Sequence, residues 1–156
     1  LTLAREGETV GETRMVSLAA VAGRAWNAVR TEGADLRIDT SDHVRADPDR
    51  LQGAFENLFR NSVEHAAAVD ERPRTRDVDV TVTVDVGEEC FFVADDGPGI
   101  PPEDHDAVFE EGYTTNDDGT GFGLPIVKRI AEAHGWTVHL GDSWADGACF
   151  TFETRE

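Results

Sequence analysis

The sequence has very little lysine: 13 of its 14 basic residues are arginine, and Lys128 is the single lysine. Basic residues are also few beside the 32 acidic ones, so the formal net charge is -18. General binders of nucleic acids or of anionic membranes need a positive face. The charge balance therefore excludes both classes of protein.

Long apolar runs and cysteines are scarce too. The chain contains no run of about 18 apolar residues, which excludes a membrane-spanning helix, and no basic-then-apolar N-terminal segment that would indicate a signal peptide. Cys90 and Cys149 are too few for a disulfide framework and lack metal-ligand spacing. Both lie in apolar runs, so we expect buried free thiols in a reducing cytoplasm.

The chain has the length and apolar content of one domain. It holds 156 residues, of which 39% are hydrophobic, enough for one packed core. It begins at Leu1 rather than Met, so we expect a fragment of a longer protein. The scattered acidic residues and the near absence of lysine resemble the composition of proteins from salt-accumulating halophilic archaea. Such a charged chain is tolerated in molar salt, because the Debye length falls to about 3 Å and the repulsion between its acidic residues is screened. A merely acidic mesophilic domain is the alternative.

Apolar periodicity predicts an alternation of helices and strands. Apolar residues three and four positions apart predict a helix over Met15–Val29. Asp47-Pro48 is a typical start of a second helix, whose predicted apolar stripe is Leu51, Phe55, Leu58, Phe59, Ser62, Val63 and Ala66. Strict alternation predicts a strand over Val78–Val86, forming a hairpin with Cys90–Ala94. The remaining predicted elements are strand-like pieces at Leu36–Ile38 and His43–Ala46, a helix at Gly123–His134 closed by Gly135, and strands at Trp136–Leu140 and Ala148–Phe152. Together they predict an α/β (α+β) two-layer sandwich, with about three helices on one face of a mixed sheet of about five strands.

Two asparagines on the second helix form the first motif. Asn57 and Asn61 are four residues apart, so their side chains project from the same helical face. A carboxamide oxygen is a neutral hard ligand that suits a Mg²⁺ ion already carrying phosphate oxygens. The alternative is a pair of exposed polar residues.

The second motif, Asp95-Asp96-Gly97-Pro98-Gly99-Ile100, directly follows a buried strand. We expect the Asp95 carboxylate at the mouth of that strand, where it can accept a hydrogen bond from an exocyclic amine such as that of adenine. Gly97 and Gly99 would let a ligand lie against bare backbone. Considered alone, the motif could equally be an ordinary turn.

The third motif, Gly119-Thr120-Gly121-Phe122-Gly123-Leu124, runs into the third helix. Free N–H groups at a helix N-terminus bind anions without any basic side chain. The motif is neither a P-loop, since no Gly-Lys-Ser/Thr follows, nor a Rossmann fingerprint, since the strand order and glycine spacing differ. A helix N-terminal loop without a special role is the alternative.

The order of the three motifs resembles the catalytic ATP-binding domain of sensor histidine kinases, in the broader family shared with gyrase, heat-shock protein 90 and mismatch-repair ATPases. The likeness extends from about Met15 to Phe152 and implies the Bergerat ATP-binding fold. Four segments resemble the N, G1, F and G2 boxes of that family, in this order: ENLFRNSVEHA, VADDGPGIP, VFEEGYTT and GTGFGLPIVKRIAEAHG.

The resemblance implies ATP and Mg²⁺ as cofactors and assigns a role to each matched residue. Asn61 would coordinate Mg²⁺, Asn57 would lie beside the phosphates, and Asp95 would bind the adenine amino group. The other implied contacts are Gly97, Gly99 and Ile100 in the adenine pocket, His65 near the ring and sugar, Phe109 and Tyr113 as anchors of a lid with Thr114 and Thr115 at its hinge, and Gly119, Thr120, Gly121, Phe122, Gly123 and Leu124 along the triphosphate.

The resemblance also implies domain boundaries and partners. Residues 1–13 are similar to the end of a dimerisation helix and a linker, and residues 14–156 to the catalytic domain. The partners would be upstream dimerisation helices of the same protein, which carry the phosphoacceptor histidine, and a response-regulator receiver domain. We expect a monomeric fragment, a homodimeric full-length protein, no nucleic-acid partner and a cytoplasmic domain, whether or not the full protein is tethered to a membrane.

The sequence departs from the kinase pattern in its basic residues. Glu64 stands where kinases often have a lysine, and no basic residue lies between Asp95 and Val127. Backbone amides, Mg²⁺ and Arg60 would then have to neutralise the γ-phosphate, while Lys128 is expected on the surface. We therefore expect tight nucleotide binding to need high salt.

The same residues favour phosphoryl transfer over ATP hydrolysis. A hydrolase of the gyrase type needs a general base at the first N-box position, and Asn57 cannot accept a proton. None of the five histidines lies in a segment that resembles a phosphoacceptor box, so this fragment should not phosphorylate itself. The alternatives are a non-catalytic nucleotide-binding module (a pseudokinase), a serine kinase of the anti-sigma type, and an acidic interaction protein.

Overall fold

The computed structural model describes residues 11–29, 34–69, 80–96, 109, 123–142 and 148–154, with the side chains of residues 64–69, 123 and 142 left out. Its elements are β1 (Arg14–Ser17), α1 (Leu18–Ala28), β2 (Ala34–Ile38), β3 (His43–Ala46), α2 (Pro48–Val69), β4 (Val80–Gly87), β5 (Cys90–Asp95), α3 (Gly123–Ala133), β6 (Thr137–Asp142) and β7 (Ala148–Glu153). None of the described helices is long and apolar enough to cross a membrane.

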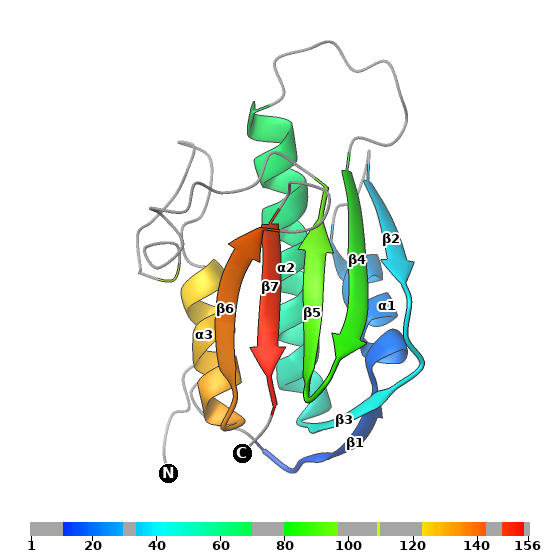
Figure 1. Ribbon diagram of the computed structural model, residues 1–156, viewed down its shortest axis with the longest axis vertical. Coiled ribbons are helices and arrows are strands. Elements are labelled where there is room, and N and C mark those ends of the chain that lie inside the picture. Colours follow the sequence, from blue (N-terminus) through cyan, green and yellow to red (C-terminus); the bar gives the residue numbers. More distant parts are fainter. Residues whose placement is uncertain are drawn as a thin grey trace.

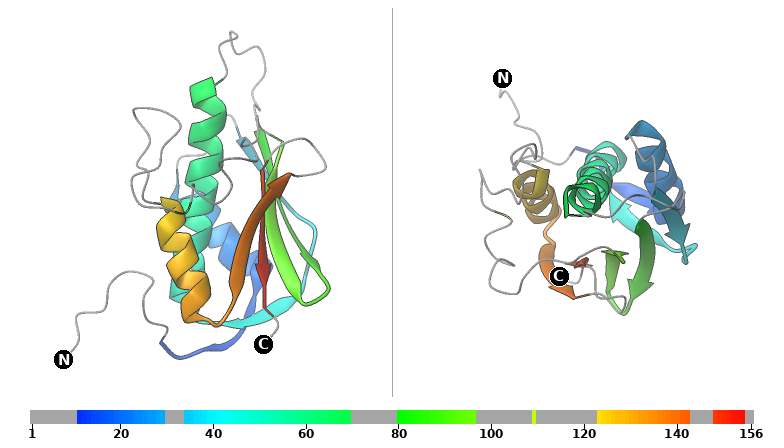
Figure 2. Two further views of the ribbon diagram at one scale, coloured as in Figure 1. Left: turned by 60° about the vertical axis from the view of Figure 1, so that its left-hand side comes forward. Right: turned by 90° about the horizontal axis from the view of Figure 1, so that it is seen from above.

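Five strands form one mixed sheet in the order β2-β4-β5-β7-β6. β2 is parallel to β4, and the other neighbours are antiparallel. Helices α1, α2 and α3 pack side by side on one face of this sheet, with α2 in the middle (Figures 1 and 2). The predicted two-layer fold and the β4–β5 hairpin are confirmed.

The predicted start of the first helix at Met15 is wrong. Met15 and Val16 belong to β1, which pairs with β3 in a separate two-stranded sheet. Val16 is buried in the core, whereas Met15 is 55% exposed. The helix begins after Ser17, whose hydroxyl oxygen accepts a hydrogen bond from the Ala20 N–H at 3.1 Å and so caps the first turn.

Helix α2 lies at the centre of the helical layer, and it begins as the sequence predicts. Asp47 precedes Pro48, and its Oδ1 accepts hydrogen bonds from the N–H groups of Asp49 and Arg50. The predicted apolar stripe is buried at Leu51, Phe55, Leu58, Phe59 and Ser62. Burial of these large side chains fixes which face of α2 lies on the sheet.

Aromatic rings fill the space between the two layers. Phe91 of β5 stacks on Phe152 of β7 at 4.7 Å and meets Phe55 of α2 edge-on at 6.0 Å. Phe55 in turn stacks on Phe59, and Trp136 meets the other side of Phe91. Such ring pairs add stability beyond their buried area, so β5, β7 and α2 form the rigid centre of the domain.

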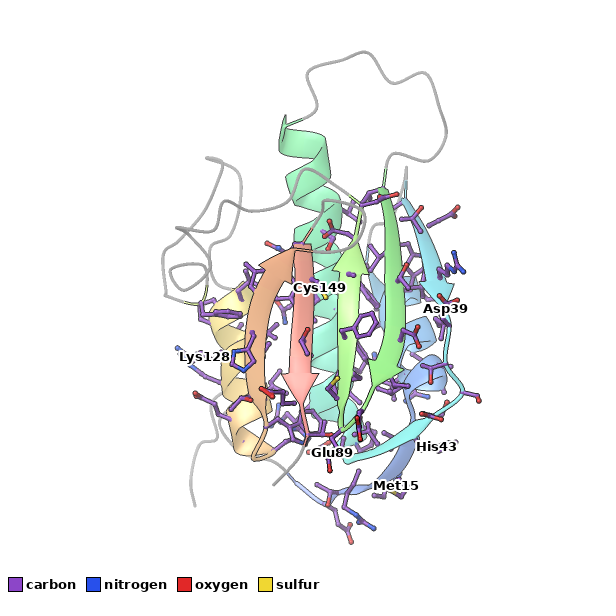
Figure 3. The ribbon with its side chains drawn as sticks, viewed as in Figure 1. Met15, Asp39, His43, Glu89, Lys128 and Cys149 are labelled. Carbon is purple, nitrogen blue, oxygen red and sulfur yellow. The ribbon has the colours of Figure 1, made fainter. Side chains whose placement is uncertain are left out.

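Both cysteines are half-buried, not buried as expected, and both thiols are free. Their strand neighbours Phe91, Phe150 and Phe152 face the core, so the cysteines lie on the face of the sheet that the helices leave uncovered (Figure 3 labels Cys149). Burial raises the pKa of the Cys149 thiol, and the charge of Asp95 adds to the rise, although a hydrogen bond with Thr151 opposes it. The thiol therefore stays protonated, and unreactive, at neutral pH.

Helix α3 ends at the predicted glycine. Gly135 has φ of +80°, the Trp136 N–H donates to the Ala131 carbonyl, and the Gly135 N–H donates to the Glu132 carbonyl. This pattern is a Schellman motif, in which glycine adopts the left-handed conformation at low cost. His134 also caps this end of the helix, because its Nδ1 lies 2.8 Å from the Ile130 carbonyl oxygen.

The Asp47 cap predicts an acid-sensitive contribution to stability. Burial raises the pKa of this carboxyl, but hydrogen bonds from the N–H groups of Gly11, Arg50 and Asp49, with the charge of Arg50, lower it below the ordinary 3.8. A lowered folded-state pKa stabilises the fold above the unfolded value and loses that effect as pH falls through the folded value. We expect Asp47→Ala to lower the free energy of unfolding by about 1–2 kcal/mol at pH 7.

The measurement is urea unfolding of wild type and Asp47→Ala at several pH values. The difference between them should shrink as pH falls from about 5 to about 2. Asp49→Ala is the matched control in the same helical turn, and it should show a smaller difference at pH 7. A pH-independent difference for Asp47→Ala would contradict this account of the cap.

Candidate nucleotide-binding site

Asp95, the last residue of β5, is the buried carboxylate of the site. Only 9% of the residue is exposed, although it lies at the end of a strand. The Ala148 N–H of β7 donates to its Oδ1 at 3.1 Å, and the Ser62 hydroxyl of α2 donates to its Oδ2 at 2.9 Å. Because each oxygen has a separate donor, the plane of the carboxylate is fixed.

Ser62 is the site residue that sequence reasoning did not single out. It appeared there as a member of the apolar stripe of α2, whereas the structure shows it 5% exposed and bound to Asp95. A hydroxyl on an otherwise apolar stripe was the available signal, because a buried polar group needs a partner. This bond joins the helical layer to the sheet beside the second motif.

Asn57 and Asn61 are both half-buried on α2, immediately before Ser62 in the chain. The Asn57 Nδ2 donates to the Gly53 carbonyl at 2.8 Å, which orients its amide and leaves its oxygen as the acceptor. Asn61 forms no hydrogen bond with another described residue that would occupy its amide oxygen. The pair therefore presents two neutral amide oxygens on one flank of the helix.

That flank faces away from α1. Gln52 accepts a hydrogen bond from Arg24 of α1 and donates to Glu56, so Gln52 and Glu56 mark the side of α2 next to α1. At about 100° per residue, Asn61 lies about 140° around the helix from Glu56. Since α2 lies between α1 and α3 (Figure 2), the asparagines are on the α3 side.

Helix α3 runs antiparallel to α2 and begins with the last residues of the third motif. Gly123 is its first residue, and Leu124 is 6% exposed within the core. The unpaired N–H groups of such a terminus carry partial positive charge and attract phosphate. Figure 1 shows α3 beside α2, and by helix geometry the asparagines are on the side of α2 that faces α3.

Phe109 is the one residue of the segment 97–122 that the structure describes. It is half-buried, and its ring meets Phe150 of β7 edge-on at 6.2 Å. The expected lid anchor is thus in contact with the sheet two residues from Ala148, which holds Asp95.

Several predicted site residues lie outside the described part of the chain. They are Gly97, Gly99, Ile100, Tyr113, Thr114, Thr115, Gly119, Thr120, Gly121 and Phe122. For His65, only the backbone in α2 is described. The structure thus brings Asp95 and α2 together through Ser62, and the roles implied for these other residues stay predictions.

Charge near the site agrees with the sequence analysis. Lys128 is exposed on the outer side of α3, as expected (Figure 3), and Arg60 is half-buried on α2. The described residues contain no group of three or more His, Cys, Asp or Glu side chains placed to hold a metal ion. A Mg²⁺ ion that brings its own phosphate and water ligands needs only one or two protein oxygens, which the asparagine pair can supply.

Comparison with known proteins identifies the family. Residues 46–156 match the family model described as histidine kinase-, DNA gyrase B- and HSP90-like ATPases. The chain belongs to this family. Membership of an ATPase family implies that the domain binds ATP.

Similar members of the family are sensor kinases. The chain is 38% identical over 115 residues to the sensor histidine kinase ZraS of Klebsiella oxytoca, covering 70% of this chain and 22% of that protein. It is 30% identical over 159 residues to the methanogenesis regulatory histidine kinase FilI of Methanothrix harundinacea, covering 97% and 18%. The chain thus spans about a fifth of the length of these curated relatives.

Solved structures of this ATPase family have the same fold. The mycobacterial sensor histidine kinase MprB superposes with a TM-score of 0.68 at 25% identity, covering 90% of this chain and 95% of that one. The catalytic domain of histidine kinase ThkA gives 0.66 at 22% identity, covering 91% and 94%. The fold of this chain is therefore that of histidine kinase catalytic domains.

The Ser62–Asp95 bond predicts a specific loss of nucleotide affinity. Ser62→Ala removes one of the two donors that hold the Asp95 carboxylate, so we expect ATP affinity to fall by about three- to tenfold, the net value of an ordinary hydrogen bond. Calorimetric titration with ATP measures it. Ser62→Thr, which keeps the hydroxyl, is the control and should bind more tightly than Ser62→Ala. Equal affinities for all three proteins would show that the bond does not orient Asp95.

Proposed function

We propose that this domain binds Mg²⁺-ATP and donates the γ-phosphate to a histidine on a separate dimerisation domain of the same protein, as part of a two-component signalling system. The observation that carries the proposal is the buried Asp95 carboxylate, joined through Ser62 to the helix that presents Asn57 and Asn61. One end of this arrangement suits an adenine, and the other suits a metal-bound triphosphate.

Asp95 would recognise adenine. An ionised carboxylate offers about four acceptor positions, so it can hold its bonds from Ser62 and Ala148 and still accept from an exocyclic amine. Guanine presents a carbonyl oxygen at the equivalent position, and two acceptors repel each other. The fixed carboxylate therefore favours ATP over GTP.

Asn61 and Asn57 would hold the phosphate end. The amide oxygen of Asn61 fits Mg²⁺, which prefers hard oxygen ligands, and Asn57 lies one turn away on the same flank. When bound, Mg²⁺ neutralises charge on the β- and γ-phosphates. The N-terminal amides of α3 would add backbone donors where the chain has few basic side chains.

The described residues favour transfer over hydrolysis. Asn57 cannot act as a base, and Glu56 is held by Gln52 on the α1 side of the helix. Among the described side chains of α2, none would then supply a carboxylate base to activate a water molecule beside the phosphates. Positioning and charge stabilisation, which dominate phosphoryl transfer, remain available.

The acceptor would come from outside this domain. Among the described histidine side chains, His134 contacts Asp47 and Ile130, and the His139 Nε2 lies within hydrogen-bond distance of Glu153, at 2.8 Å. His43 is exposed on β3, beside the labelled Met15 of β1 (Figure 3). We therefore propose an acceptor histidine on dimerisation helices, a response-regulator receiver domain as the next acceptor, and a cytoplasmic location for the domain.

Nucleotide binding is the first test. We expect wild type to bind Mg²⁺-ATP, and Asp95→Asn to lose most of that binding, because an amide cannot replace both acceptor oxygens. Calorimetry in about 0.1 M and then multimolar KCl measures both proteins, and binding should tighten at high salt because salt screens the charge of -18. Failure of wild type to bind ATP at either salt concentration would overturn the proposed function.

Phosphotransfer is the second test. With labelled ATP and a separately expressed dimerisation domain from a similar kinase, wild type should phosphorylate the acceptor histidine and leave itself unlabelled. Asn61→Ala removes the proposed Mg²⁺ ligand and should reduce the rate by on the order of 100-fold, a typical cost of lost phosphate positioning. Lys128→Ala, at the exposed residue on the outer side of α3 (Figure 3), is the control. ATP binding without transfer to the acceptor would instead support a pseudokinase.

A further inference from the structure

A hydrogen bond joins the beginning of α2 to the end of α3. The main-chain N–H of Asp47 donates to Nε2 of His134 at 3.0 Å. The other ring nitrogen, Nδ1, lies 2.8 Å from the Ile130 carbonyl oxygen, which can only accept, so Nδ1 carries the proton and Nε2 its lone pair. Trp136 stacks on the imidazole at 4.3 Å and holds the ring plane. We call this arrangement the Asp47–His134 latch.

The latch lies at one end of two antiparallel helices. Asp47 immediately precedes α2, and His134 immediately follows α3. Figure 2 shows the two helices side by side along their length. A contact at this end therefore fixes the position of one helix relative to the other along their axes.

Helix geometry relates this end to the proposed phosphate site. At 1.5 Å per residue, Asn57 lies about 15 Å and Asn61 about 21 Å along α2 from Asp47. Gly123, the first residue of α3, lies about 16 Å along α3 from His134. The latch thus brings the asparagines level with the N-terminus of α3.

Apolar packing alone would fix the position of α2 along its axis relative to α3 less sharply. Leu51 and Leu58 of α2 share the core with Val127 and Ala131 of α3, but apolar contacts have no preferred direction. A hydrogen bond weakens steeply when its length or angle changes. Among the described residues, the latch supplies a directional contact between these two helix ends.

We propose that His134 is a positioning residue for phosphate binding. Through the main-chain N–H of Asp47, it sets the position of Asn57 and Asn61 along α2 relative to the N-terminal amides of α3. The inference rests on the proposed function, because it concerns the site for the Mg²⁺-triphosphate. Adenine recognition, which depends on Asp95 and Ser62, should not depend on it.

Two substitutions test the roles of the two ring nitrogens separately. His134→Gln places an amide oxygen near the position of Nε2 and can still accept from Asp47. His134→Asn keeps a donor for the Ile130 carbonyl but loses the acceptor for Asp47. Asp47→Ala is the control, since it weakens the helix cap but keeps the main-chain N–H of the latch.

The measurements are calorimetric affinities for Mg²⁺-ATP and for adenosine, with thermal unfolding of each variant. We expect His134→Asn to weaken Mg²⁺-ATP binding by about tenfold, as for one misaligned contact to a charged group, and to leave adenosine binding unchanged. His134→Gln and Asp47→Ala should bind Mg²⁺-ATP close to wild type. If His134→Asn does not fold, His134→Phe replaces it, because phenylalanine keeps the ring and lacks both nitrogens.

The outcomes separate this inference from the proposed function. If the Mg²⁺-ATP affinity falls in step with thermal stability across all variants, including Asp47→Ala, the proposed role of the latch is wrong. The proposed function would stand, because the domain would still bind nucleotide. Equal loss of adenosine and Mg²⁺-ATP affinity in His134→Asn would also overturn the proposed role of the latch. Absence of Mg²⁺-ATP binding by wild type would overturn both the proposed function and the inference.

Discussion

The start of α2 depends on Asp47, and the rest of the domain depends on α2. The carboxylate of Asp47 accepts from Gly11, Asp49 and Arg50, while its own N–H donates to His134. One residue thus connects the chain before β1, the central helix and the end of α3. Because α2 also carries the buried stripe and the asparagine pair, its starting position determines where the site forms.

A second polar contact joins the layers further along the same helix. Ser62 binds Asp95 in a region that is otherwise apolar. A buried polar group without a partner is costly, so each of the two residues requires the other. Between Asp47 and Ser62, the aromatic core holds α2 against β5 and β7, so the described half of the nucleotide site rests on rigid elements.

The sequence predicted most of the fold, because most of its signals are local. The proline and aspartate at the start of α2, the glycine after α3 and the alternating valines of β4 each act within a few residues. The strand β1 was missed because its apolar residues also fit a helical period and its partner β3 lies far along the chain. The prediction that both thiols are buried was wrong because residues of an apolar strand alternate between the two faces of the sheet. Only the packing of the helices shows which face is covered.

The sequence by itself determined the family motifs, their order and the excess of acidic charge, since these are properties of residue type and spacing. It also determined the candidate ligands Asn57, Asn61 and Asp95. Only the tertiary structure decided that Ser62 orients Asp95, that Glu56 turns toward α1, and that His134 contacts the start of α2. Each of these depends on residues brought together from distant positions or on which side of a helix meets a neighbour. Spacing along the chain does not specify such contacts, because they form only when the layers pack.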